Sequence, residues 1–207
     1  MIAIIDYKAG NLTSVQRALE KIGEESIISH EPHKILAADH VIFPGVGAAG
    51  AAMESLNGSG MGAVLKQCIS EGKPVLGICL GTQIIMESSE EDGGVNCLGI
   101  IPGHTVRFQF DSPNVTVPQM GWNQVNFVKE HPVFEGIADG TNFYFVHSYY
   151  PDPAVEENAL AKTEYSGLSF TSALTMGNLV ATQFHPEKSG RHGLELLKNF
   201  AQWDGRL

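Results

Sequence analysis

Over the first 90 residues, short runs of apolar, often β-branched residues alternate with stretches in which apolar residues recur every three or four positions. The short runs predict buried strands, and the recurring spacing predicts helices. The predicted strands cover residues 1–6, 26–29, 40–43 and 74–78. One predicted helix runs from a cap at Asn11 to Gly23, and a second follows the 44–47 turn. Two more cover residues 61–70 and about 81–88. Strands separated by helices predict right-handed crossovers and a parallel sheet that is covered on both faces.

The pattern changes in the second half, where residues 98 to about 183 show mostly strands and turns. The clearest predicted strands are 143–147, 159–165, 170–175 and 179–184, and a closing helix is predicted over 190–203. We therefore expect one α/β domain over residues 1–207. Its central sheet is expected to be mostly parallel and flanked by helices, with antiparallel strands added late in the chain.

The composition is typical of a globular protein in a reducing compartment. Hydrophobic residues make up 43% of the chain, and 13 Lys+Arg against 23 Asp+Glu leave a net charge of −10. This charge disfavours nucleic acids and anionic membrane surfaces as partners. The sequence shows neither a basic leader nor an apolar run of about 20 residues. Its 3 cysteines lack paired spacing and its histidines match no zinc pattern, so we expect a cytoplasmic protein without a metal site.

The stretch around Cys79 carries the strongest chemical signal. Gly77-Ile78-Cys79-Leu80-Gly81 places a cysteine between a predicted strand and a predicted helix, with a glycine two positions before it and two after. Such a sharp turn presents a nucleophile at the end of a sheet, and the glycines let the strand and helix backbones pass closely. The helix N-terminus favours a thiolate and leaves the Leu80 N–H free to meet an oxyanion. The alternative is that Cys79 is only a small buried apolar residue.

A thiolate needs a base, and His185 is the best candidate among the 8 histidines. It ends an apolar strand and precedes Pro186-Glu187. Because proline keeps the preceding residue extended, we expect His185 and Glu187 to project to one side. The carboxylate would then orient the imidazole, as the third member of a triad does. The alternative is a strand-end histidine beside a solvated carboxylate.

A second oxyanion donor is expected from another loop at the same edge of the sheet. Pro44-Gly45-Val46-Gly47 directly follows a predicted strand, and its glycines permit unusual backbone angles and close approach. The alternative is an ordinary turn between a strand and a helix. Cys68 and Cys97 lie in no comparable surroundings, and we interpret both as structural.

In this order, these residues resemble the class I glutamine amidotransferases, whose signature is a cysteine elbow followed far downstream by His-x-Glu. The resemblance covers essentially the whole chain. Further blocks are similar to those of one subfamily, the glutaminase subunits of imidazole glycerol phosphate synthase. These blocks are Asp6-Tyr7 with Gly10-Asn11-Leu12, Phe43-Pro44-Gly45-Val46-Gly47, Pro118-Gln119-Met120-Gly121-Trp122-Asn123, Tyr144-Phe145-Val146-His147-Ser148-Tyr149-Tyr150 and Gln183-Phe184-His185-Pro186-Glu187-Lys188-Ser189.

The resemblance implies a flavodoxin-like fold and the hydrolysis of L-glutamine to glutamate and ammonia without a cofactor. It makes Cys79 the nucleophile, His185 the general base and acid, and Glu187 the residue that orients it. The implied oxyanion hole consists of Leu80, Val46 and Gly47. The implied glutamine contacts are Gly47, Gln83 and the strand end His147-Ser148-Tyr149.

The same resemblance implies a heterodimer with a cyclase subunit, a (β/α)8 barrel that docks over the glutaminase site and receives its ammonia. Gln119, Trp122 and Lys188 would then lie at or near the docking surface. Core packing of Trp122 and a solvated charge at Lys188 are the alternatives. A further hypothesis is that the 45–47 backbone turns correctly only once the partner and its ligand bind, which would keep glutamine from being wasted.

The sequence leaves three other functions open. A glutaminase subunit of another synthase, such as the pyridoxal phosphate or purine enzymes, would keep the chemistry and change the acceptor of ammonia. A stand-alone thiol hydrolase acting on γ-glutamyl or peptide substrates would need no partner. A binding module with a vestigial triad would leave Cys79 unreactive toward a glutamine-like electrophile.

Overall fold

A computed structural model describes residues 1–8 and 10–206, which form a 9-stranded sheet and a 4-stranded sheet. In spatial order, the strands of the large sheet are β2 (Ser26–Ser29), β1 (Ile2–Ile5), β3 (His40–Gly45), β4 (Val75–Cys79), β13 (Leu179–Thr182), β12 (Leu168–Met176), β11 (Ala159–Tyr165), β8 (Gln119–Phe127) and β9 (Thr141–His147). The strands from β2 to β13 pair in parallel, and those from β12 to β9 are added by antiparallel pairing.

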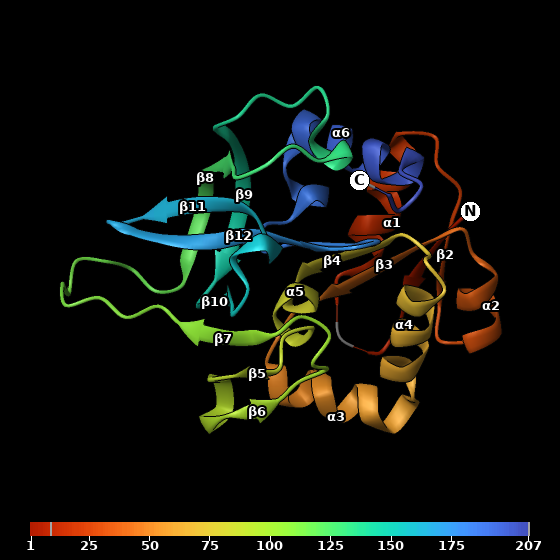
Figure 1. Cartoon of the computed structure of the whole chain (residues 1–207), viewed down its shortest axis with the longest axis horizontal. Helices are drawn as coiled ribbons and strands as arrows, with labels where there is room; N and C mark the ends of the chain where they lie inside the picture. The colour runs from red at the N-terminus through yellow and green to blue at the C-terminus, as the bar shows by residue number, and fades with distance from the viewer. Residues whose placement is uncertain (9, 207) are drawn as a thin grey trace.

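The small sheet lies beside the antiparallel end of the large one (Figure 1). Its strands are, in spatial order, β10 (Tyr149–Pro153), β7 (Gly103–Arg107), β5 (Ser88–Ser89) and β6 (Val95–Asn96). The α-helices are α1 (Leu12–Lys21), α2 (Pro32–Ala37), α3 (Ala49–Ser59), α4 (Met61–Ser70), α5 (Leu80–Ile84) and α6 (Gly190–Gln202). Four single 3-10 turns are η1 (Glu91–Gly93), η2 (Pro132–Phe134), η3 (Glu156–Asn158) and η4 (Pro186–Lys188).

Helices cover both faces of the parallel strands (Figure 1). α1 and α6 lie on one face, while α2, α3, α4 and α5 lie on the other. Successive residues of β1 divide between the two layers, because Ile2 and Ile4 pack with the side chains of α1 and α6, whereas Ala3 and Ile5 pack with those of α2 to α4. A strand buried on both faces needs a continuous apolar run, which is the pattern that predicted it.

The predicted fold class is confirmed: the chain forms a helix-covered parallel sheet with antiparallel strands added by its second half. The predicted strands 26–29 and 159–165 and the predicted helix 61–70 match the observed bounds. Asn11 does occupy the N-cap of α1, but its side chain makes no capping hydrogen bond. Its carbonyl oxygen instead accepts the Ser14 N–H at 3.2 Å.

One predicted helix was too long, and one helix was not predicted. The helix after Cys79 was predicted to reach residue 88, but α5 ends at Ile84. The returning segment 98–101 donates its N–H groups to the carbonyls of Ile84, Ile85 and Met86, so these carbonyls find partners without further helix. Helix α2 was missed, because its 6 residues are too few for a periodic pattern; the proline at its first turn was the available signal.

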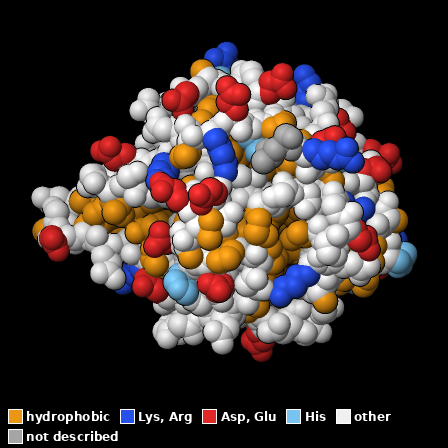
Figure 2. Space-filling model, in the orientation of Figure 1, with side chains coloured by type: hydrophobic (Ala, Val, Ile, Leu, Met, Phe, Trp, Pro, Cys, Tyr) orange, Lys and Arg blue, Asp and Glu red, His pale blue; other side chains and the backbone are white. Residues whose placement is uncertain are grey.

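Charge is mixed over the face seen in Figure 2, where Lys and Arg side chains are interspersed with Asp and Glu. Among the described residues, no helix has the length and apolar character needed to cross a membrane.

His131, at the start of η2, is a buried histidine that the fold holds neutral. Its Nδ1 accepts the Val133 N–H at 3.2 Å, and its ring lies edge-on to Trp203 with the centroids 4.9 Å apart. Burial, helped by the nearby Lys129 ammonium, lowers the pKa of His131 from 6.5 to about 4. Protonation of Nδ1 would break the cap, so the folded state resists binding this proton.

We expect stability to fall as the pH drops from 6.5 toward 4, because the unfolded chain binds a proton at His131 before the folded chain does. Between pH 7.5 and pH 5, the group accounts for about 2 kcal/mol of the free energy of unfolding. His131→Asn retains a capping side chain but cannot titrate, so its stability should depend less on pH by this amount in urea titrations at the two pH values.

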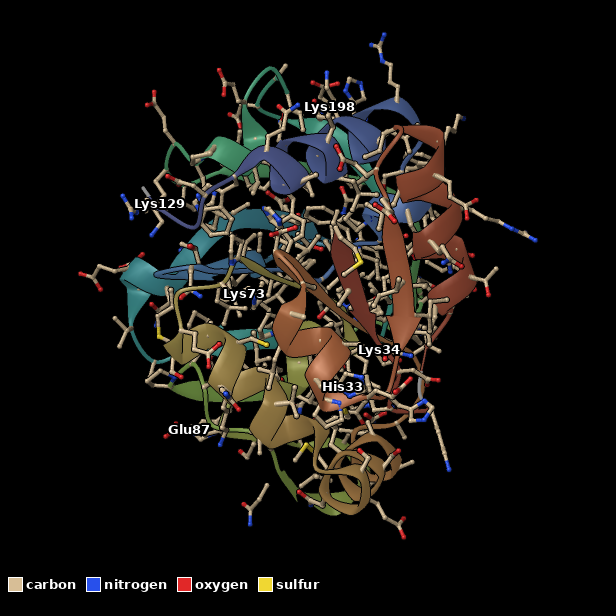
Figure 3. The ribbon with its side chains drawn as sticks, turned by 90° about the vertical axis from the view of Figure 1, so that its right-hand side faces the viewer. His33, Lys34, Lys73, Glu87, Lys129 and Lys198 are labelled. Atoms are coloured by element: carbon tan, nitrogen blue, oxygen red, sulfur yellow. The ribbon has the colours of Figure 1, made fainter. Side chains whose placement is uncertain are left out.

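His33→Asn is the matched control, since His33 lies on the surface in α2 with its side chain 75% exposed (Figure 3). It should leave the pH dependence unchanged. A His131→Asn variant with the full pH dependence of the original chain would contradict the assignment.

Candidate active site

Cys79 lies on a sharp turn between β4 and α5. Its backbone angles are φ 54° and ψ −109°, a left-handed conformation that is strained for any residue with a side chain. The flanking glycines make this turn possible. A Cβ at Gly81 would collide with the carbonyl oxygen of Phe43, and one at Gly77 would lie 3.0 Å from the Cβ of Ala181. Leu80 begins α5 directly after Cys79, so its N–H has no helical partner, and both residues line the same cavity.

The 44–47 segment lies directly beside this elbow. Gly45 ends β3 and pairs in register with Cys79 on β4. A side chain at Gly45 would collide with the hydroxyl of Tyr7, which is buried and has no hydrogen-bond partner among the described residues. Gly47 has φ 100°, which favours glycine. Val46 and Gly47 both line the cavity in front of Cys79.

His185 and Glu187 form a closely bonded pair at the end of the neighbouring strand. The distance from His185 Nδ1 to Glu187 Oε1 is 2.7 Å, and both side chains are only 2% exposed. The expected reason for this contact was right only in part. His185 itself is extended, with φ −100° and ψ 97°, as the proline that follows it predicts. The backbone does not stay extended to Glu187 but turns as η4, and Ser189 Oγ donates a hydrogen bond to the His185 carbonyl oxygen, closing the turn.

The protonation of His185 depends on its two neighbours. Burial by itself would lower the pKa of the imidazole, but the interactions with Cys79 and Glu187 outweigh it and raise the pKa well above 6.5. Nε2 has no hydrogen-bond partner within the described part of the chain. It is therefore the ring atom left to exchange a proton with Cys79 or with a ligand in the cavity.

A cavity of about 310 Å³ opens in front of Cys79 and His185. Its walls are Val46, Gly47, Cys79, Leu80, Gln83, Glu91, Pro118, Val146, His147, Ser148, Tyr149, His185 and Lys188. A larger cavity of about 710 Å³ lies along residues 127–139, but none of its lining residues is a cysteine or a serine. The chemistry therefore assigns the smaller cavity as the site, and its volume suits a small ligand. Among the described residues, no group of three His, Cys, Asp or Glu side chains is arranged to hold a metal ion.

Two residues expected to contact substrate are engaged by the protein itself. Gln83 Nε2 donates to the Tyr149 carbonyl at 2.8 Å and to Gln183 Oε1 at 3.0 Å, so only its Oε1 is left for a ligand. The His147 nitrogens face the Tyr149 carbonyl at 2.8 Å and Gln119 Oε1 at 3.0 Å. His147 thus contributes a wall of the cavity and has no free polar atom to offer.

Glu91 is a cavity residue that the sequence analysis missed. Its Oε2 accepts the Ala49 N–H at 2.7 Å at the start of α3, and burial raises the pKa of its carboxyl group. The signal was present as an acidic run at residues 87–92, but a run of charges on a loop is most often solvated. Only the turn at η1 brings one member of this run back to the cavity.

Three apolar side chains near the cavity are exposed: Val46 is 41%, Met120 65% and Trp122 57% exposed. Val46 lines the cavity, and Met120 pairs across β8 and β9 with Val146, which also lines it. Trp122 pairs with Tyr144 across β8 and β9, and the Lys188 ammonium lies 5.9 Å from the centre of the Tyr144 ring. We call Val46, Met120, Trp122, Tyr144 and Lys188 the rim.

Core packing, the alternative for Trp122, is excluded by its exposure. Gln119, also expected at or near the docking surface, is only 3% exposed, and its side chain contacts His147 instead of presenting a surface.

The family described as "Glutamine amidotransferase class-I" matches residues 3–203. The solved structures that resemble the chain include one described as a glutamine amidotransferase, with a TM-score of 0.75 at 16% identity over 99% of this chain and 100% of that one. Another is PurLQS from Thermotoga maritima, with a TM-score of 0.73 at 16% identity over 97% of each chain. At such identities these two structures support the fold alone.

The more similar relatives are proteins named "Imidazole glycerol phosphate synthase subunit HisH". The chain is 46% identical over 200 residues to the protein from Dehalococcoides mccartyi, covering 97% of this chain and 96% of that one. It is 49% identical over 201 residues to the protein from Moorella thermoacetica, covering 97% and 94%. The chain therefore belongs to the class I glutamine amidotransferases and, within them, to the family of the HisH subunits.

Proposed function

We propose that this chain is the glutaminase subunit of imidazole glycerol phosphate synthase, acting as one domain over residues 1–207. The observation that carries the proposal is the arrangement of the triad: a strained elbow cysteine, an imidazole whose Nε2 has no partner among the described residues, and a buried carboxylate on its Nδ1. Its HisH relatives are similar along nearly the whole chain, which supports the synthase as the setting for this chemistry.

The reaction follows from the protonation of the triad. Because the interactions with Cys79 and Glu187 raise the pKa of His185, its Nε2 can accept the proton of the Cys79 thiol, which leaves a thiolate beside an imidazolium. The thiolate attacks the side-chain amide carbon of L-glutamine, and the N–H groups of Leu80 and of the Val46–Gly47 segment stabilise the oxyanion. His185 then gives its proton to the leaving nitrogen, which departs as ammonia.

Hydrolysis of the acyl-enzyme completes the cycle. His185, now neutral, takes a proton from water, which attacks the γ-glutamyl thioester and releases glutamate and the thiolate. Glu187 keeps Nδ1 protonated throughout, so that Nε2 remains the working nitrogen. No step needs a cofactor.

Substrate binding is assigned to the walls of the cavity. Glu91 and the Gln83 Oε1 accept hydrogen bonds, so they suit the α-ammonium group of an amino acid, whereas Ser148 and the backbone of Gly47 and Tyr149 remain for its carboxylate and side chain. In this assignment Ser148 and Tyr149, and not His147, are the residues of this strand end that contact the substrate.

The partner is proposed to be the cyclase subunit, a (β/α)8 barrel, bound as a heterodimer in the cytoplasm. Ammonia is protonated in bulk water, so a synthase benefits from passing it internally to the cyclase. The reaction that the cyclase then completes is classed as a lyase reaction. The rim suits this role, since an exposed tryptophan and methionine around a reactive cavity are typical of a binding surface.

The first test is glutamate release from L-glutamine by the purified chain, alone and with the cyclase subunit and its nucleotide ligand. We expect low activity alone and a large rise in the complex.

Cys79→Ala should lower the activity of the complex at least about a thousandfold, because it removes the nucleophile. Cys97→Ala, a half-buried cysteine outside the cavity, is the control and should remain active. High activity alone that the cyclase does not change would contradict the proposal and indicate another synthase or a free-standing hydrolase.

A second prediction concerns Glu91. Glu91→Gln keeps an acceptor for the Ala49 N–H but removes the charge that faces the ammonium group of glutamine. We expect the KM for glutamine to rise roughly 10–100-fold with little change in kcat. The control is Glu90→Gln, a neighbouring exposed carboxylate outside the cavity. An unchanged KM in the Glu91 variant would show that the ammonium group binds elsewhere.

A third prediction concerns the rim. Trp122→Ala should weaken binding of the cyclase roughly 30-fold, as expected for a tryptophan at the centre of an interface. Lys188→Ala should weaken it less, and calorimetric titration measures both. Val155→Ala, which removes an apolar side chain that is 42% exposed outside the rim, should leave binding unchanged. Unaltered affinity in both rim variants would place the docking surface elsewhere.

A further inference from the structure

A continuous chain of buried hydrogen bonds leads from strand β8 to the sulfur of Cys79. It begins at Gln119 and His147, passes through the Tyr149 carbonyl to Gln83, and continues through Gln183 to Cys79. The last link joins Gln183 Nε2 to Cys79 Sγ over 3.7 Å. Neither the triad nor the substrate assignments explain why an amide that is fully buried should lie against the nucleophile.

The direction of each hydrogen bond is fixed by one backbone carbonyl. The Tyr149 oxygen can only accept, so Gln83 must point its NH2 group toward it. The same NH2 group then meets Gln183, which must present its Oε1. A carboxamide that presents its oxygen on one side presents its NH2 on the other, and that side faces Cys79 Sγ.

The same carbonyl fixes His147. Its Nδ1 faces the Tyr149 oxygen and must carry a proton. Burial lowers the pKa of His147 to about 4, so the ring is neutral and its Nε2 has no proton to give. The Gln119 atom 3.0 Å from Nε2 is placed as Oε1, which would bring two acceptors together. With the oxygen and nitrogen of the Gln119 amide exchanged, its NH2 group faces Nε2 and every member of the chain has a matched donor and acceptor.

Gln183 reaches Cys79 from behind the residues that line the cavity. It does not line the cavity, and its backbone N–H is engaged by the Ser172 carbonyl at 2.9 Å. A role in binding glutamine is therefore excluded by its position. A purely structural role would be met as well by an apolar side chain of the same size, which would need no partner in this buried place.

Resting on the proposed function, we propose that Gln183 is a positioning residue for Cys79: its amide N–H, held in one orientation by Gln83 and the Tyr149 carbonyl, stabilises and aims the thiolate. A hydrogen bond to a charged sulfur is stronger than one to a neutral thiol, so the N–H favours the reactive form. It also holds Sγ in place while the substrate enters the cavity.

The test is the reactivity of Cys79 toward iodoacetamide as a function of pH, followed on its own peptide by mass spectrometry in the full-length chain without glutamine. Gln183→Met fills the same space without a donor, and we expect the pH midpoint of alkylation to rise by about one unit. Gln183→Glu puts a second anion beside the thiolate and should raise it further. In the complex with the cyclase, kcat for glutamine should fall about tenfold in Gln183→Met while KM changes little.

Gln202→Met and Gln202→Glu make the same changes at an exposed position of α6 and should leave the alkylation profile unchanged. Gln83→Met provides a second arm if the Gln183 variants do not fold, since it frees the Gln183 amide to turn and should shift the midpoint in the same direction. Folded variants with an unchanged alkylation profile would overturn the proposal. Because the alkylation needs neither glutamine nor a cyclase, this result is independent of whether the proposed function holds.

Discussion

The left-handed backbone of Cys79 is the constraint on which the rest of the site depends. With φ at 54°, the chain leaves β4 and enters α5 within one residue, which places Sγ beyond the end of the parallel strands and leaves the Leu80 N–H beside it. The turn can form only because α5 lies against the Phe43 carbonyl at Gly81, where a side chain would not fit. The burial of β3, β4 and β13 between the two helical layers offsets the cost of this strained backbone. The conformation of the nucleophile therefore depends on the parallel core.

Two histidines line the same cavity and are held in opposite protonation states. His147 contacts uncharged groups, so burial dominates and its pKa falls to about 4. His185 is equally buried, but its neighbours are a carboxylate and a thiol, and their interactions raise its pKa instead. One imidazole can therefore serve as a fixed hydrogen-bonding element while the other moves protons, although both belong to strand ends of the same sheet.

The sequence predicted the parallel strands and the elbow, which depend on interactions between residues close together in the chain. Apolar runs located the parallel strands, and glycines two positions either side of Cys79 indicated the elbow. His185 and Glu187 were selected as a pair, although through an extended backbone that is in fact a 3-10 turn. Tertiary contacts determine the remainder. Helix α5 ends early because residues 98–101 donate hydrogen bonds to the carbonyls at its end. Glu91 and Gln183 reach the site through turns and neighbouring strands, which a periodic pattern does not predict. Gln119 and Trp122 lie three residues apart on β8 and so on opposite faces of the strand, and the burial of one and the exposure of the other follow from which face meets the core.

The geometry also bears on how a partner would influence the reaction. Val46 and Lys188 belong both to the wall of the cavity and to the rim, so no long path separates a docked protein from the reacting atoms. A partner seated on the rim would cover the mouth of the cavity and press on the backbone beside Gly45, which is in register with Cys79. Docking would then exclude water, strengthen the electrostatic interactions of the oxyanion donors and direct the leaving ammonia toward the partner. Coupling of the two active sites would thus begin at a shared boundary, because Val46 and Lys188 belong to both the rim and the cavity wall.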